Sequence, residues 1–139
     1  MTILLDTNVL SEILRTAPDP AVLDWFSRQR DDELCLSAVT QAEMLLGVRL
    51  LPSGARQRRL QQAMSGLFEH DFEGRVLPFD GAAVPHYVDV VAIRRRAGRP
   101  VSQFDAQIAA IALHHDAALA TRNLRDFEGC GLRLINPFA

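Results

Sequence analysis

Four acidic residues lie beside apolar segments, where a carboxylate needs an explanation: Asp6, Glu43, Asp105 and Asp126. Carboxylates that gather in one place repel each other and raise one another's pKa, and a divalent cation between them removes that cost. Ligands that offer only oxygen atoms suit Mg²⁺ or Mn²⁺, and such an ion can activate a bound water. No His or Cys cluster with zinc-type spacing offers an alternative. The residue types therefore indicate hydrolytic metal chemistry, provided that the fold brings the four acids together.

Each acid also has an ordinary structural explanation when it is taken alone. Asp6 can cap a helix, because an Asp side chain at a helix start accepts backbone N–H bonds. Asp105 ends the segment Ser102–Asp105, which matches a capping box. Glu43 can lie at the edge of an apolar helical stripe and reach solvent, and Asp126 can belong to a polar turn. The metal interpretation therefore depends on the elements that position these residues.

Short apolar runs alternate with amphipathic segments along the whole chain. The runs predict strands at Ile3–Leu5, Leu34–Leu36, Arg75–Phe79, Ala118–Thr121 and Leu132–Ile135. The amphipathic segments predict helices over residues 7–15, 21–30, 38–51, 55–68, 82–97 and 102–115. This alternation predicts a three-layer α/β/α sandwich with a central, mostly parallel sheet of four to five strands. Sites in such sheets form at the carboxyl ends of the strands, where all four acids can meet.

Length and composition limit the number of domains, the binding partners and the cellular location that can be expected. A chain of 139 residues fits one domain, spanning residues 1–139, and its net charge of −2 gives no overall attraction to nucleic acid. All fifteen basic residues are arginine. Cys35 and Cys130 are isolated and are expected to be buried, reduced thiols. The first apolar run stops at Asp6, which argues against a signal peptide or membrane span, so we expect a cytoplasmic protein.

Four motifs in this order carry a resemblance that covers nearly the whole chain. They are LLDTNVLSE at 4–12, LSAVTQAEMLLGV at 36–48, QFDAQIAAIA at 103–112 and ATRNLRDF at 120–127. Together they resemble the PIN-domain family. The resemblance is nearest to the toxin ribonucleases of bacterial toxin–antitoxin modules, the VapC group with its FitB-like branch.

The resemblance implies an endoribonuclease that uses Mg²⁺ or Mn²⁺ to hydrolyse RNA. Asp6, Glu43 and Asp105 match the three nearly fixed acids of the family, which hold the metal. The fourth acid is less regular, and many members have it two residues after the threonine, where this chain has Asn123. Either Asp126 takes its place or the site uses three carboxylates.

The resemblance also implies positioning residues and partners. Asn8 and Thr121 match family positions that orient the first acid and the last loop through hydrogen bonds, and Asn123 follows in the same loop. The expected partners are an RNA substrate, a second copy of the chain and a VapB-like antitoxin, with which it can assemble on operator DNA. RNA binding requires local positive charge that contacts the phosphate backbone. The candidate RNA-binding residues, just before the helix that contains Asp105, are Arg94, Arg95, Arg96 and Arg99. For any single one of these arginines, a solvated helix face is the better explanation.

Other functions remain open from the sequence alone. A metal-dependent phosphatase with an aspartate nucleophile usually has a second Asp two residues after the first, and here that position is Asn8. A non-catalytic binding module, whose acids only cap helices, is the main alternative. The spacing does not exclude DNA as a substrate, and it leaves open whether one metal ion is bound or two.

Overall fold

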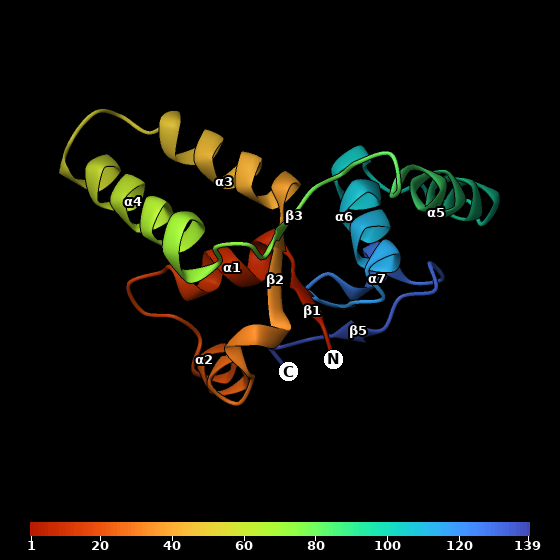
Figure 1. The fold of residues 1–139 in the computed structure, drawn as a ribbon, viewed down its shortest axis with the longest axis horizontal. Coiled ribbons are helices and arrows are strands. Elements are labelled where there is room, and N and C mark those ends of the chain that lie inside the picture. Colours follow the sequence, from red (N-terminus) through yellow and green to blue (C-terminus); the bar gives the residue numbers. More distant parts are fainter.

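The computed structural model describes all residues from 1 to 139, and a five-stranded sheet runs through its centre (Figure 1). The strands are β1 (Ile3–Leu5), β2 (Leu34–Ser37), β3 (Val76–Leu77), β4 (Ala118–Ala120) and β5 (Leu134–Ile135). Their order across the sheet is β3-β2-β1-β4-β5, and every neighbouring pair is parallel. The predicted α/β class is confirmed, and the sheet is entirely parallel.

Helices cover both faces of the sheet. They are α1 (Thr7–Ile13), α2 (Pro20–Ser27), α3 (Ala38–Arg49), α4 (Ala55–Gly66), α5 (Val84–Arg96), α6 (Gln103–His114) and α7 (Leu124–Phe127). Figure 1 shows α3 and α4 on one side of the strands and α5 and α6 on the other. A short 3₁₀ helix precedes β2 at Asp31–Glu33, and a π-helical turn at Leu67–Asp71 follows α4. No helix combines the length and the apolar character needed to cross a lipid bilayer.

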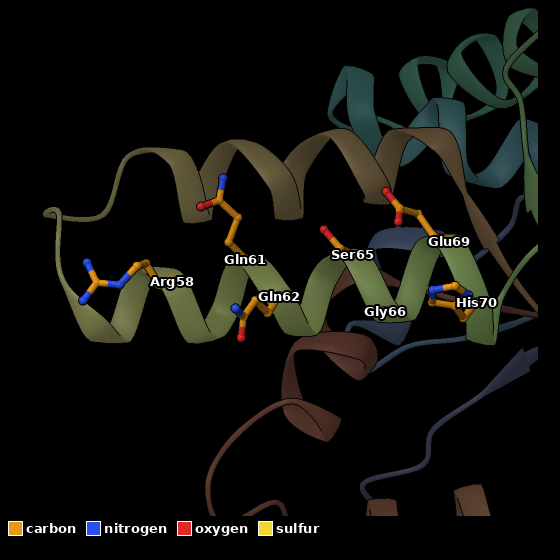
Figure 2. A pocket seen from close by; sticks show the side chains of 7 residues that line it. All are labelled: Arg58, Gln61, Gln62, Ser65, Gly66, Glu69 and His70. Atoms are coloured by element: carbon orange, nitrogen blue, oxygen red, sulfur yellow. The ribbon is translucent and has the colours of Figure 1, made fainter.

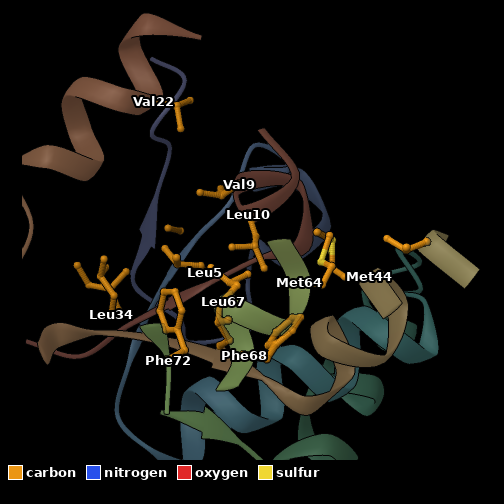
Figure 3. Packing of buried hydrophobic residues seen from close by; sticks show 14 residues of the cluster. Leu5, Val9, Leu10, Val22, Leu34, Met44, Met64, Leu67, Phe68 and Phe72 are labelled. Atoms are coloured by element: carbon orange, nitrogen blue, oxygen red, sulfur yellow. The ribbon is translucent and has the colours of Figure 1, made fainter. Parts of the chain in front are cut away.

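Two hydrophobic cores result from the alternation of side chains along the strands. Ile3 and Leu5 pack with α1 to α4 and with the turn after α4, in the cluster shown in Figure 3. Leu4 points to the opposite face and packs against α5, α6 and α7. Successive residues of a strand face opposite sides, so a strand covered on both sides must be apolar throughout. Cys35 lies in the second core with a free thiol, and burial raises its pKa to about 11.

The structure differs from the sequence-based expectation mainly after β4. A loop was expected there, whereas residues 124–127 form the single helical turn α7. Phe127 is 1% exposed and anchors this turn in the second core. A turn of four residues contains too little periodicity to be seen in a sequence. Most other elements begin and end within about two residues of their predicted bounds, as fraying helix ends lead one to expect.

Candidate active site

Asp6 lies at the carboxyl end of the central strand β1 and caps α1. Its Oδ1 accepts a hydrogen bond from the backbone N–H of Thr7 at 2.8 Å. Its Oδ2 accepts one from the Thr121 hydroxyl at 2.7 Å and one from the Asn8 side chain at 3.3 Å. The side chain of Asp6 is only 4% exposed. The sequence motif at the end of β1 therefore places a buried, tightly oriented carboxylate at the edge of the sheet.

Asn8 connects the start of α1 to the loop that follows β4. Its Oδ1 accepts a hydrogen bond from the backbone N–H of Arg122 at 3.1 Å, and its Nδ2 donates to the Thr121 hydroxyl at 3.4 Å. The Thr121 hydroxyl also accepts from the backbone N–H of Asn123 at 3.0 Å. Asn123 caps α7 without a side-chain hydrogen bond. Asn8 and Thr121 thus orient both Asp6 and the loop before α7, while Asn123 contributes through its backbone.

Glu43 reaches the same edge from α3 and is held by residues that sequence reasoning did not single out. The Thr7 hydroxyl donates to Glu43 Oε1 at 3.0 Å and lies 3.0 Å from the Thr40 hydroxyl. Since Thr7 has one hydroxyl proton, Thr40 donates in the second bond. Ser37 fixes the start of α3 by accepting a hydrogen bond from the Thr40 N–H at 2.9 Å. The missed signal is spacing, because Thr40 precedes Glu43 by three residues and so shares its helical face.

Asp105 and Asp126 bring two further carboxylates to Asp6. Asp105 lies in the first turn of α6, where its N–H donates to the Ser102 hydroxyl at 3.1 Å. Burial raises the pKa of Asp105, the charges of Asp6 and Asp126 raise it further, and Ser102 opposes the change. Burial likewise raises the pKa of Asp6, against the hydrogen bonds from Thr121 and Thr7, and the charges of Glu43 and Asp126 add to it. The four acids therefore act on one another electrostatically.

The chemistry of these donors fits a hard divalent cation. None of the four carboxylates forms an ion pair with a basic side chain, although Asp6 is buried. Buried acids without a cation are costly, and oxygen ligands suit Mg²⁺ or Mn²⁺. The acids do not stand close enough to form a ready-made coordination group. An ion bound between them would offset the repulsion between the carboxylates. The residues thus fit an ion that would draw the carboxylates together.

The expected nucleic-acid contacts at the end of α5 need one correction. Arg94 is only 5% exposed, and it donates hydrogen bonds to the carbonyls of Arg125 and Glu128. Its Nη1 is therefore occupied inside the protein and its buried Nε has no hydrogen-bond partner, so the guanidinium is not available to RNA. Arg99 is half-exposed and forms an ion pair with Glu128 at 3.3 Å. Arg95 and Arg96 are exposed. The missed signal is that Arg94 follows the buried Val90 by four residues and so lies on the inner face of α5.

A polar hollow elsewhere on the surface does not belong to this site. It has a volume of about 510 Å³, and Figure 2 shows that its lining comes from α4 and the turn after it. The lining residues are Arg58, Gln61, Gln62, Ser65, Gly66, Glu69 and His70. None of the four acids borders it, so the candidate chemistry lies only at the carboxyl edge of the sheet.

Comparison with known proteins agrees with this geometry. The family model described as PIN domain matches residues 3–129. The chain belongs to the PIN-domain family. It is 41% identical to VapC ribonuclease Y4jK of Sinorhizobium fredii over 98% of this chain and 97% of that protein. It is also 35% identical to toxin FitB of Neisseria gonorrhoeae over 98% of both chains.

The same relationship holds in three dimensions. The structure of FitAB bound to an IR36 DNA fragment contains a chain that superposes with a TM-score of 0.94 at 36% identity, covering 99% of this chain and 96% of that one. Within the PIN-domain family, the chain is thus similar to a protein named as a VapC ribonuclease and to one named as a toxin. The expected α/β/α sandwich with a sheet of four to five strands is thus the PIN fold, and its sheet has five strands.

Proposed function

We propose that the chain hydrolyses RNA phosphodiester bonds with Mg²⁺ or Mn²⁺ held by Asp6, Glu43 and Asp105, and that Asp126 completes the site. Asp6 carries this proposal, because it is a buried carboxylate without a paired cation. Glu43, Asp105 and Asp126 all interact with it or with each other through their charges. An ion at this point would offset both the burial and the repulsion. The related protein named as a VapC ribonuclease supports RNA as the substrate.

The residues of the chain would divide the work as follows. A bound divalent ion supplies the acidity that activates water and shields the charge that builds up on the phosphoryl group. Asp6 and Asp105 would bind this ion most directly. Glu43, held by the Thr7 hydroxyl at 3.0 Å, would complete the set of ligands or orient the attacking water and accept its proton. Thr121 keeps Asp6 in one rotamer during these steps.

Substrate binding requires positive charge near an acidic site. Arg95 and Arg96 are exposed at the end of α5 and can contact phosphate groups of the RNA backbone. Such contacts carry no sequence preference, so cleavage specificity must come from other contacts with the bases. We propose that this activity takes place in the cytoplasm, where the RNA substrates are found.

The partners that we propose are a second copy of the chain and a VapB-like antitoxin. A groove of about 830 Å³ lies between α1, α3 and α4. Its lining combines apolar side chains with exposed arginines: Leu14, Met44, Leu60 and Met64, and Arg15, Arg56 and Arg59. An amphipathic antitoxin segment with acidic residues beside its apolar face fits this combination. The related FitAB structure, solved with a DNA fragment, supports joint assembly on operator DNA.

A cationic side chain of the antitoxin would explain how RNA cleavage by the toxin is inhibited. Asp6, Glu43, Asp105 and Asp126 form a negative site when no metal is bound. An arginine from the antitoxin segment can bridge two carboxylates through parallel hydrogen bonds. Such an arginine would occupy the place of the metal and block the substrate at the same time.

Metal-dependent cleavage tests the catalytic proposal directly. Purified protein should cleave RNA in the presence of Mn²⁺ and stop when EDTA is added. Asp6→Asn should fold, because Asn also caps helices, and should lose at least about 100-fold in cleavage rate. Asp24→Asn is the matched control, since Asp24 is exposed on α2 and pairs only with Arg28 at 3.2 Å. Cleavage at the wild-type rate by Asp6→Asn would contradict the proposal and favour a binding module.

A further inference from the structure

Arg94 is a buried charged residue that the proposed chemistry does not use. It lies in the last turn of α5, and its Nη1 donates to the carbonyl oxygens of Arg125 at 3.1 Å and Glu128 at 2.9 Å. These two carbonyls stand on either side of Asp126 in the chain. We propose that Arg94 is a positioning residue that clamps α7 and thereby directs the Asp126 carboxylate toward the metal ligands. This inference rests on the proposed metal site.

The turn α7 needs such a clamp because it is too short to hold its own shape. A helix of four residues satisfies few of its backbone groups, and helix formation at this length is unfavourable in isolation. Asn123 provides no side-chain cap at its start. A cation at the last carbonyls of a helix satisfies them and interacts favourably with the helix dipole. Arg94 provides these contacts from a site that is 5% exposed, so water competes little for them.

Two contacts, one apolar and one polar, fix the rotation of α7. Phe127 is 1% exposed and anchors one side of the turn in the core beneath α6. Arg94 holds the carbonyls before and after Asp126. Asp126 is adjacent to Phe127 and so points about 100° away from it around the turn. The loop before α7 is tied to Asp6 through the Thr121 hydroxyl and to Asn8 through the Arg122 N–H, and the charge of Asp126 raises the pKa of both Asp6 and Asp105.

Arg99 reinforces the clamp from outside. Its Nη2 donates to the carbonyl of Arg125 at 3.4 Å, and its guanidinium pairs with the Glu128 carboxylate at 3.3 Å. Both side chains of this pair are about half exposed, at 49% and 51%. Exposed ion pairs contribute little, so Arg99 should matter less than Arg94.

Metal binding measured by calorimetry separates positioning from simple structural support. Mn²⁺ is titrated into the metal-free wild type, Arg94→Lys, Asp126→Asn and the double variant. Lysine keeps the charge but lacks the planar guanidinium, so Arg94→Lys should weaken Mn²⁺ binding about tenfold. The double variant should bind no more weakly than Asp126→Asn, because Arg94 acts through that residue. Arg28→Lys, at an exposed position just after α2, is the control and should bind Mn²⁺ as the wild type does.

Thermal unfolding of each variant shows whether it is folded. Arg99→Ala is a second variant, at an exposed position, and its Mn²⁺ affinity should fall about threefold. Unchanged Mn²⁺ affinity in both Arg94→Lys and Arg99→Ala overturns the inference, even if the unfolding midpoint falls. The inference is also overturned if the losses of Mn²⁺ affinity in the two single variants multiply in the double variant. Normal Mn²⁺ binding by Asp126→Asn overturns it as well. These results differ from a failure of the proposed function, in which the wild type binds no Mn²⁺ or Asp6→Asn binds it equally well.

Discussion

The Asp6 carboxylate accepts hydrogen bonds from Thr7, Asn8 and Thr121, yet burial still raises its pKa. The hydrogen bonds favour the charged form, so the raised pKa means that burial together with the neighbouring acids outweighs them. A carboxylate that is held in one orientation, although burial disfavours its charged form, is typical of a functional site rather than a helix cap. Asp105 shows the same combination of a structural hydrogen bond and an unfavourable charge.

These raised pKa values predict how stability depends on pH and metal. The folded protein binds protons at Asp6 and Asp105 more tightly than the unfolded chain does, so their ionisation costs stability above their folded pKa values. Without metal, Asp6→Asn should therefore be more stable than the wild type at pH 7. The difference should shrink as the pH falls through the folded pKa toward 3.8, the ordinary pKa of an aspartate. Unfolding midpoints measured across this range check the prediction, and a difference independent of pH would contradict it.

Metal should reverse the order of stability at pH 7. Mn²⁺ at about 100 times its dissociation constant stabilises a folded protein by about 2.7 kcal/mol, which corresponds to a rise of roughly 8 °C in the unfolding midpoint here. The wild type should show this rise and Asp6→Asn should lose most of it. Equal shifts in both proteins would mean that Mn²⁺ binds elsewhere.

The relative importance of the four acids is also testable. Asp105→Asn should reduce RNA cleavage by at least about 100-fold, because it removes a charge that we place in direct contact with the metal. Asp126→Asn should cost only about tenfold if Asp126 completes the site from further away. Asn123→Asp should restore or raise activity, since it supplies an acid at the position common in the family. Complete loss of RNA cleavage in both Asp105→Asn and Asp126→Asn would show instead that Asp126 is a primary ligand.

At the level of elements, Ser102 links the stability of α6 to the position of Asp105. Its hydroxyl accepts the Asp105 N–H at 3.1 Å at the start of the helix. Ser102→Ala should lower the free energy of unfolding by about 1 kcal/mol, as the loss of a helix cap usually does. Chemical denaturation measures this change, and Ser65→Ala, at an exposed position inside α4, is the control. Equal stabilities of the two variants would mean that Ser102 does not act as a cap.

The elements also explain how far the sequence could predict the site. Asp6 and Glu43 were predictable because each follows a recognisable strand or lies on a clear helical stripe. Arg94 was not, because the run Arg94-Arg95-Arg96 offers three identical side chains and only their contacts distinguish them. The turn α7 depends on that same long-range contact, so local sequence could not reveal it. Sequence pattern thus predicts elements and their order well, whereas residues that act across elements emerge only in three dimensions.

For the whole molecule, we expect the chain to be toxic through its four site acids. We expect the antitoxin to relieve this toxicity by binding the groove between α1, α3 and α4. Expression of the wild type alone should slow growth, and co-expression of its VapB-like antitoxin should restore growth. Asp6→Asn should be harmless without any partner. The double variant Arg56→Glu with Arg59→Glu should remain toxic in the presence of the antitoxin, because the reversed charges repel an acidic segment. Growth curves check these outcomes, and a benign wild type with intact RNA would contradict the toxin assignment.

The hydrogen bond between Asp6 and Thr121 joins residues that lie 115 positions apart in the chain. The central strand β1 is made first, but its partner β4 begins only at Ala118. At about 5–20 residues per second, a ribosome needs roughly 6–23 s to travel from one residue to the other. Chains stalled before Thr121 should therefore be protease-sensitive and unable to cut RNA. The ribosome that makes this chain is thus exposed to its activity only after β4 and Thr121 have been added.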